Sequence, residues 1–182
     1  MNAPLSSAGE IVAFWQQAGA DRWFKKDTAF DDEIRARFLA SYEAAAAGKL
    51  RDWEQSAQGA LALLLLLDQF PRNMFRGNAR TYATDPLARA VAAGAIVRGF
   101  DAQVPQDLRG FFYLPFMHSE DLADQERAVT LYRVAGLAEL KYAEEHADII
   151  RRFGRFPHRN AVLGRTTTPE EQAFLDGGGF KG

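Results

Sequence analysis

Apolar side chains recur at steps of three and four residues along most of the chain, which is the spacing of one helix face. No stretch keeps the two-residue alternation of a half-buried strand, so we expect no sheet. A first helix is predicted to begin after a cap at Ser6 or Ser7. A second is predicted to begin at Asp27 or Asp31 and to end at Gly48. The pattern therefore predicts an all-α fold.

The third predicted helix is capped by Asp52 and runs from Trp53 to Phe70. Its second half, Leu61 to Leu67, is apolar on every face, which predicts the central buried helix. Further helical segments are predicted from caps, prolines and glycines at Asp85-Pro86, Pro105, Ser119, Gly136 and Thr168-Pro169-Glu170-Glu171, for about seven or eight helices in all.

No low-complexity linker divides the chain, so we expect one domain over residues 1–182 with a frayed tail at 176–182. Short turns between helices predict antiparallel helical hairpins packed side by side. Phenylalanine is abundant, at 14 residues, and we expect some of them to remain exposed and to support self-association, as a homodimer, through an apolar helical face.

Composition excludes several kinds of site. The chain has no cysteine, so disulfides, thiolate nucleophiles and thiolate metal sites are excluded. The beginning of the chain has no basic segment before Glu10, and the longest aliphatic run, Ala60 to Leu67, is too short to span a bilayer. We therefore expect a cytoplasmic protein with no membrane partner. A net charge of −2 gives no general attraction to nucleic acid.

Arginine dominates the basic residues. Of 22 basic residues, only five are lysine, which leaves 17 arginines. Arginine makes planar, bidentate contacts with carboxylates and phosphates and tolerates burial better than lysine. A genome rich in guanine and cytosine would produce the same bias, so both explanations stay open.

Asp68 is the first candidate site residue. It is predicted to lie at the C-terminal end of the most apolar helix, where the helix dipole disfavours an anion. A buried carboxylate needs a cation, and Arg72 follows four residues later, next to Asn73. Two interpretations stay open, which are a structural ion pair at the helix end and one wall of a polar pocket.

His118 precedes the predicted cap at Ser119 and is followed by Glu120 and Asp121. The two acids have a sufficient local role in the first turn of a helix, where the dipole favours them. A histidine at this position can hydrogen-bond to a nearby carboxylate or act as an acid–base group near neutral pH.

The segment from Arg151 to Arg165 holds five arginines and His158, with no acid at all. Aromatic residues interleave with the arginines, so the segment should pack against the core. Arg155 and Arg159 are its candidate ligand-binding arginines. Two interpretations stay open, which are internal ion pairs, with Asp68, Glu120 or Asp121 as acceptors, and an anion site.

The string Gln69-Phe70-Pro71-Arg72-Asn73 recurs, with one insertion, as Arg155-Phe156-Pro157-His158-Arg159-Asn160. Gly77 and Gly164 follow the two copies. The match is either chance or a pair of similar proline-fixed turns that face one cavity. We predict that both copies converge with His118 on one polar pocket.

Other chemistry lacks support. Three histidines without an HExxH spacing do not predict a metal site, and no Gly-rich nucleotide loop or GxSxG elbow occurs. We therefore expect neither a metal nor a cofactor. The three tryptophans are predicted to be core residues.

Four ordered strings carry a family resemblance: Phe30-Asp31-Asp32-Glu33-Ile34-Arg35, Leu67-Asp68-Gln69-Phe70-Pro71-Arg72-Asn73, Tyr113-Leu114-Pro115-Phe116-Met117-His118-Ser119-Glu120-Asp121 and Gly154-Arg155-Phe156-Pro157-His158-Arg159-Asn160. They resemble the signature of an uncharacterised bacterial family in the tetratricopeptide-like helical superfamily, over residues 10 to 175. The resemblance implies a right-handed array of helical hairpins and no particular activity. No clean repeat of about 34 residues is visible, so the array is expected to be degenerate.

Two functions stay open. The first is a binding module for an anionic small ligand or peptide, bearing carboxylate or phosphate, at an Arg- and His-rich pocket. The second is an enzyme in which His118 is the acid–base group, Asp68 or Asp121 orients it, and Arg72, Arg155 or Arg159 holds an anionic substrate. We favour binding because no nucleophile is evident. A small, deep, closed pocket would favour the enzyme, and an open groove would favour a peptide-binding module.

Overall fold

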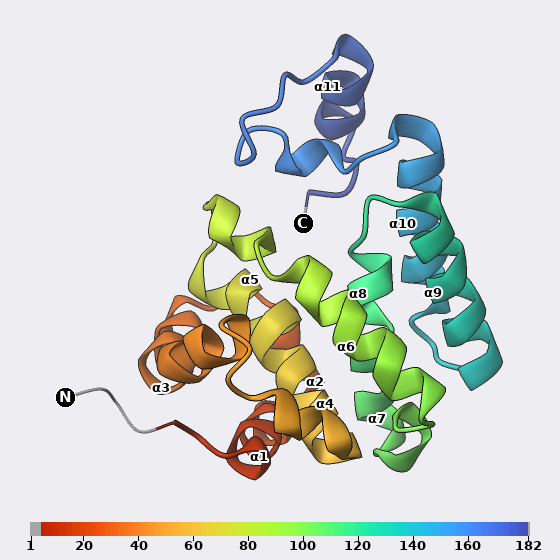
Figure 1. Ribbon diagram of the computed structural model, residues 1–182. Coiled ribbons are helices and arrows are strands. Elements are labelled where there is room, and N and C mark those ends of the chain that lie inside the picture. The colour runs from red at the N-terminus through yellow and green to blue at the C-terminus, as the bar shows by residue number, and fades with distance from the viewer. Residues whose placement is uncertain (1–4, 182) are drawn as a thin grey trace. The chain divides into compact units, whose positions relative to one another are not determined.

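The computed structural model describes residues 5–181 (Figure 1). These residues form eleven α-helical segments joined by short turns and contain no strand, so the all-α prediction is confirmed for the described chain. The segments outnumber the predicted seven or eight helices because several, such as α2 (Ala20–Trp23) and α8 (Leu114–Met117), are single turns.

The described residues form two compact units. Unit 1 comprises residues up to 76 and 80–115, and unit 2 comprises 77–79 and the residues from 116 onward. The single domain over residues 1–182 stays a prediction. Residues 1–4 lie outside the described residues, and so does residue 182 of the predicted tail.

Two helices of unit 1 begin at predicted caps. Ser7 caps α1 (Ala8–Ala18) in a capping box with Glu10, and Asp27 caps α3 (Thr28–Ala46). In both cases a side-chain oxygen accepts a hydrogen bond from a backbone N–H that the helix leaves without a partner.

The prediction for the third helix is wrong at both ends. Asp52 lies in a 3-10 turn, and the helix α4 (Ala57–Leu64) begins after Ser56, whose hydroxyl accepts a hydrogen bond from the N–H of Gly59. A π turn (η2, Leu65–Gln69) follows, and α5 (Phe70–Met74) continues through Pro71. The chain therefore stays helical beyond Phe70.

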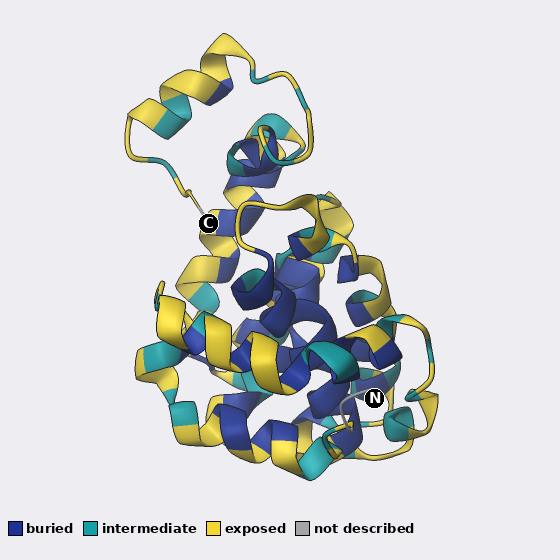
Figure 2. Cartoon of the chain, turned by 90° about the vertical axis from the view of Figure 1, so that its left-hand side faces the viewer, coloured by how far each residue is buried: buried dark blue, intermediate teal, exposed yellow. Residues whose placement is uncertain are grey.

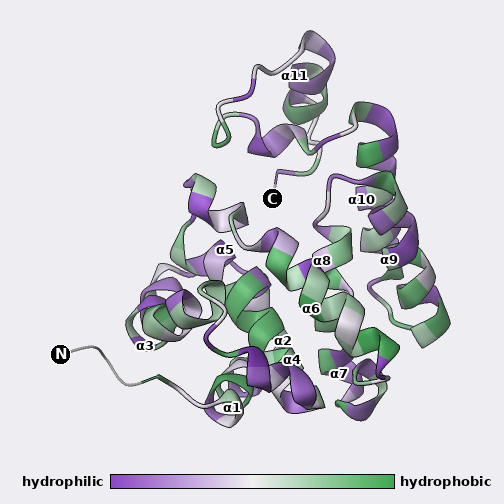
Figure 3. Cartoon of the chain, viewed as in Figure 1, coloured by the Kyte–Doolittle hydropathy of each residue, from purple (hydrophilic) through white to green (hydrophobic). Residues whose placement is uncertain are grey.

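The apolar centre of unit 1 is α4 with the π turn, as predicted. Leu64, Leu65 and Leu66 have no exposed surface, and Figure 3 draws this segment largely in the green of hydrophobic residues. The helices α1, α3 and α6 (Asp85–Val97) pack around it. Aromatic rings fill the space beside it, since the ring centre of Phe38 lies 4.9 Å from that of Phe14 and 5.0 Å from that of Phe70.

Trp15 and Trp23 are buried and Trp53 is half-buried, so the first two are core residues as predicted. The remaining segments of this unit are short: η4 (Asp101–Gln103), α7 (Gln106–Arg109) and η5 (Gly110–Phe112).

Unit 2 is built on α9 (Leu122–Ala135) and α10 (Leu140–Phe153), which pack against each other. Both bury one face and expose the other. Figure 2 shows the same alternation of buried and exposed turns along the helices nearest the viewer. Ile149, Ile150 and Phe156 form its apolar cluster, against which Phe153 and Phe174 pack. The last helix, α11 (Pro169–Asp176), begins with the predicted capping box of Thr168 and Glu171.

The predicted cap at Ser119 is wrong. The cap of α9 is Asp121, whose carboxylate accepts hydrogen bonds from the N–H groups of Ala123 and Asp124. Glu120 therefore lies before the helix and is available for other contacts. None of the helices within residues 5–181 has the length and apolar character that a membrane span requires.

Candidate functional site

Asp68 lies inside the π turn of unit 1 and not at a helix end. Arg72 Nη1 lies 3.3 Å from a carboxylate oxygen of Asp68, and its two terminal nitrogens each lie 3.1 Å from the carboxylate of Asp85. Burial alone would lower the pKa of Arg72, but the charges of Asp68 and Asp85 outweigh it and the pKa is raised. Arg72 is thus held as a cation between two carboxylates, which is the arrangement of an internal ion-pair cluster.

The backbone around Asp68 is held by side chains. Pro71 has no N–H to donate to the carbonyl of Leu67, four residues earlier, and the hydroxyl of Thr84 donates to that oxygen at 2.6 Å. Arg72 also donates to the carbonyl oxygen of Asp68. The continuation of the helix through proline therefore depends on residues outside it.

Asn73 points to a different acid. Its amide donates to Asp31 at 2.7 Å, and Arg76 contacts the two carboxylate oxygens of Asp31 at 2.6 Å and 3.1 Å. In unit 1 the structure therefore separates the predicted set into two clusters, one around Arg72 and the other around Asp31.

Glu120 is the centre of one cluster in unit 2. Its carboxylate accepts hydrogen bonds from Arg165 at 2.7 Å and 3.0 Å and from the backbone N–H of Phe156 at 2.8 Å. Burial acts to raise the pKa of Glu120, but the hydrogen bonds from Arg165 and Phe156 outweigh it and the pKa is lowered. Glu120 is thus an internal acceptor for an arginine of the basic segment, as one of the two interpretations holds.

Arg155 belongs to a second cluster in this unit. It donates to both carboxylate oxygens of Glu171, at 2.6 Å and 2.9 Å. Glu171 also accepts from the amide of Asn160 at 3.0 Å and from the backbone N–H of Thr168 at 2.8 Å. These contacts lower the pKa of Glu171 to about 2, with the hydrogen bond from Arg155 as the largest cause.

The repeated string has a chemical counterpart in the structure. Asn73 of the first copy shares Asp31 with Arg76, three residues beyond the string, and Asn160 of the second copy shares Glu171 with Arg155 of the same string. Gly77 and Gly164 both have a positive φ, of 73° and 65°, where a side chain would be strained.

The backbone of the two copies differs, so the prediction of two proline-fixed turns is wrong for the first. Pro71 lies within α5, whereas Pro157 opens a 3-10 turn (η6, Pro157–Arg159). The reason is that the π turn already carries the chain in a helical conformation up to Phe70, and Thr84 compensates for the N–H that Pro71 lacks.

The three histidines, His118, His146 and His158, belong to unit 2. Burial lowers the pKa of His158 from 6.5 to about 3, and the charges of Arg159, His146 and His118 act in the same direction while Glu120 opposes them. Nδ1 of His158 is buried without a hydrogen-bond partner among the described residues. His158 is therefore neutral near pH 7, and the groups whose charges act on its pKa include three other predicted site residues, His118, Glu120 and Arg159.

Aromatic rings lie next to His158. Phe180 lies 4.5 Å from the ring of His146 and 5.1 Å from that of His158, and Arg159 is buried with its guanidinium 4.5 Å above Phe156. Nδ1 of His146 lies 2.7 Å from the carbonyl oxygen of Tyr142, so this nitrogen carries the proton. No three acidic or histidine side chains within the described ranges are placed to hold a metal ion.

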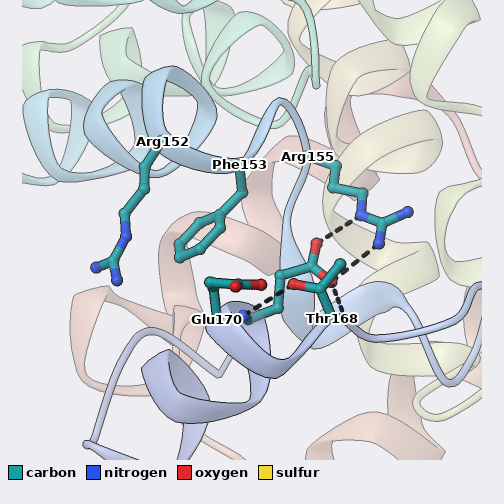
Figure 4. A pocket seen from close by; sticks show the side chains of 6 residues that line it. Arg152, Phe153, Arg155, Thr168 and Glu170 are labelled. Atoms are coloured by element: carbon teal, nitrogen blue, oxygen red, sulfur yellow. Dashed lines mark hydrogen bonds and ion pairs between the residues drawn. The ribbon is translucent and has the colours of Figure 1, made fainter.

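An open pocket of about 540 Å³ lies between the end of α10 and the beginning of α11 (Figure 4). Of the predicted site residues it contains Arg155; the other lining residues, which sequence reasoning did not select, are Arg152, Phe153, Thr168, Glu170 and Glu171. In Figure 4 the Phe153 ring lies between the guanidinium groups of Arg152 and Arg155. Arg155 is the one that pairs with Glu171.

Arg152 is held differently from its neighbours. Its guanidinium carbon lies 4.6 Å above the ring of Phe153 and 5.7 Å from the ring centre of Phe174. Arg151, by contrast, pairs with Asp148 and Glu126. Within residues 5–181, the side chain of Arg152 forms no ion pair and no hydrogen bond, so it is a cation oriented by aromatic rings alone.

The nine predicted residues divide between the units. Asp68, Arg72 and Asn73 belong to unit 1, and the other six belong to unit 2. Convergence of the two sets on one pocket stays a prediction. Within unit 2, Asp121 is a helix cap, and Arg155 lies in the pocket.

The described residues thus define an all-α protein with internal ion-pair clusters and one carboxylate-free arginine at an open pocket. Residues 11–179 match the family described as bacterial protein of unknown function (DUF924), and the chain belongs to this family. A solved structure of a protein of unknown function from Agrobacterium tumefaciens, ATU0120, is 56% identical and covers 93% of this chain and 97% of that chain, with a TM-score of 0.91. No match was found among the curated proteins. The predicted membership of an uncharacterised bacterial family is confirmed.

Proposed function

We propose that the protein binds a small ligand with a carboxylate or phosphate group, and that Arg152 holds that group in the pocket between α10 and α11. The observation that carries the proposal is the state of Arg152, which stands at a pocket of about 540 Å³ with two aromatic rings and no carboxylate partner in the described chain. A guanidinium oriented in this way loses little side-chain freedom when it forms two parallel hydrogen bonds with an anion.

The shape of the pocket supports binding more than catalysis. Arg152, Thr168 and Glu170 are exposed, so water reaches the pocket freely. Enzymes that act on small substrates commonly exclude water from the reacting groups. A degenerate tetratricopeptide-like array of helical hairpins, a fold that commonly presents ligand-binding surfaces, belongs to the same proposal.

The test compares two arginines of unit 2. Arg127 is a matched control for Arg152, because its guanidinium lies 4.3 Å above the ring of Phe116, it too lacks an ion pair in the described residues, and it does not line the pocket. Isothermal titration calorimetry with 3-phenylpropionate and with inorganic phosphate measures binding. We expect Arg152→Gln to weaken binding by about tenfold or more, the loss of one charged hydrogen-bonding group.

Arg127→Gln is expected to bind both probes as the unchanged protein does. Equal binding by the unchanged protein and Arg152→Gln, or equal losses in both variants, would overturn the proposal. Far-ultraviolet circular dichroism of both variants checks that each remains folded.

A further inference from the structure

The wall of the pocket between α10 and α11 holds a second charged side chain without a polar partner. Glu170, in the first turn of α11, lines the pocket beside Arg152 and is exposed. Its carboxylate forms no ion pair and no side-chain hydrogen bond with any residue in the described part of the chain, and it does not pair with Arg152. One cation and one anion of the wall are therefore both available to a ligand.

The other two charges of the wall neutralise each other. Arg155 and Glu171 form a bidentate pair, and Glu171 accepts further hydrogen bonds from Asn160 and Thr168. This network fixes the beginning of α11 against the chain that follows α10. It leaves Arg152 and Glu170 as the charges that decide which ligand fits.

A ligand with only negative charge meets opposing forces in such a pocket. Its anionic group gains from Arg152, but the carboxylate of Glu170 repels it. A ligand that also carries an ammonium group turns this repulsion into attraction. The ring of Phe153, which lines the same pocket, offers apolar surface for the part of the ligand between or beside its charges.

We propose that the ligand of this pocket is a small zwitterion with a carboxylate and an ammonium group, of the class of free α-amino acids. The inference rests on the proposed function, because it takes Arg152 as the carboxylate-binding group. Glu170 binds the ammonium group. A role of Glu170 confined to the helix dipole of α11 would affect stability and would not distinguish between ligands.

Three probes that differ in one charged group test the inference. L-phenylalanine carries both groups, 3-phenylpropionate lacks the ammonium group, and 2-phenylethylamine lacks the carboxylate. Isothermal titration calorimetry is expected to show L-phenylalanine binding about fivefold tighter than 3-phenylpropionate, the upper range for one solvent-accessible ion pair. 2-Phenylethylamine is expected to bind more weakly than L-phenylalanine, because it cannot engage Arg152.

Glu170→Gln is expected to remove this preference. The ratio between L-phenylalanine and 3-phenylpropionate should fall below about twofold, mainly through weaker binding of the amino acid. Glu139→Gln is the matched control, because Glu139 is an exposed acid at the beginning of α10, it forms no side-chain cap and it does not line the pocket. This variant should keep the full preference. Thermal unfolding of both variants shows whether either change acts on the fold.

The outcomes separate the two proposals. If 3-phenylpropionate binds as tightly as L-phenylalanine and Arg152→Gln weakens both, the inference about Glu170 fails and the anion site remains. If Glu170→Gln leaves the preference unchanged, the ammonium group is held elsewhere and the inference also fails. If none of the probes binds, or Arg152→Gln binds them unchanged, the proposed function itself fails.

Discussion

Thr84 donates its hydroxyl hydrogen to the carbonyl oxygen of Leu67, and the two oxygens are 2.6 Å apart. Leu67 is the residue whose carbonyl would accept a hydrogen bond from position 71, where proline has no N–H. Thr84 is buried and stands immediately before α6. One hydroxyl group therefore links the beginning of α6 to the π turn that precedes Pro71.

Thr84→Val is expected to lower the free energy of unfolding by about 1 to 3 kcal/mol, because a buried carbonyl loses this donor while the volume of the side chain is kept. Urea unfolding followed by circular dichroism measures the change. Thr84→Ser keeps the hydroxyl and should lose clearly less. A Thr84→Val variant that is as stable as the unchanged protein would show that this hydrogen bond contributes nothing to stability.

Leu64→Ala is expected to cost about 2 to 5 kcal/mol, since the side chain has no exposed surface and its removal leaves a cavity in the centre of unit 1. The same urea experiment measures it. Leu87, which is 44% exposed on α6, provides the control, and Leu87→Ala should change stability far less. A loss under about 0.5 kcal/mol for Leu64→Ala would contradict the buried position of this helix.

The lowered pKa of Glu171 implies that the protein loses stability in acid. Its pKa falls from 4.5 to about 2 on folding, chiefly through the hydrogen bond from Arg155, so the folded protein binds this proton less readily than the unfolded chain. The stabilisation is fully present above about pH 4.5 and decreases as the pH falls toward about 2. Unfolding free energies measured over this range should fall less steeply in Glu171→Gln than in the unchanged protein. Parallel curves would show that Glu171 contributes nothing to the acid transition.

The lowered pKa of His158 implies a further loss of stability that begins at a higher pH. Because burial lowers its pKa from 6.5 to about 3, the unfolded chain takes up this proton first as the pH falls below 6.5. Stability should therefore decrease between about pH 6.5 and 3 through this residue, and His158→Gln should reduce the slope. In the folded protein, the nuclear magnetic resonance signal of the His158 ring should show no titration step near pH 6.5. A step there would contradict the buried, neutral state.

Local signals were predicted well from the sequence. The structure selects Ser7 from the pair Ser6 and Ser7, and Asp27 from the pair Asp27 and Asp31, and it confirms the capping box of Thr168 with Glu171. The run of leucines between 61 and 67 predicted burial correctly because no face of that helix can meet water favourably.

The errors arose where two residues compete for one role. Asp52 and Ser56 can each cap a helix, as can Ser119 and Asp121, and packing against distant segments decides between them. The π turn has no signal in composition, so Asp68 was assigned to a helix end. Its partner across space, Asp85, shares Arg72 only because α6 returns to this turn.

The candidate site was predicted only in part for a similar reason. The basic segment was recognised, and Glu120 was correctly among its proposed acceptors. Which arginine would remain without a carboxylate depends on the face of α10 that each one occupies. Arg151 reaches Asp148, while Arg152, one residue later and about 100° around the helix, faces Phe153 and Phe174 instead. This difference has two causes, the rotation between successive residues of α10 and the position of α11. Sequence spacing gives the rotation, but it does not give the position of α11.

The π turn at Leu65–Gln69 also determines which changes of length the gene can accept in this segment. Removing one leucine there would allow an ordinary α-helix to form without a break, and local hydrogen bonding would improve. Because a π turn takes up one extra residue within nearly one turn, the residues of α5 would keep nearly their present orientation. Arg72 would still face Asp85, and Asn73 would still face Asp31. A single-codon deletion in this run of leucines is therefore expected to be tolerated better than one inside α3, where the residues that follow would rotate by about 100°.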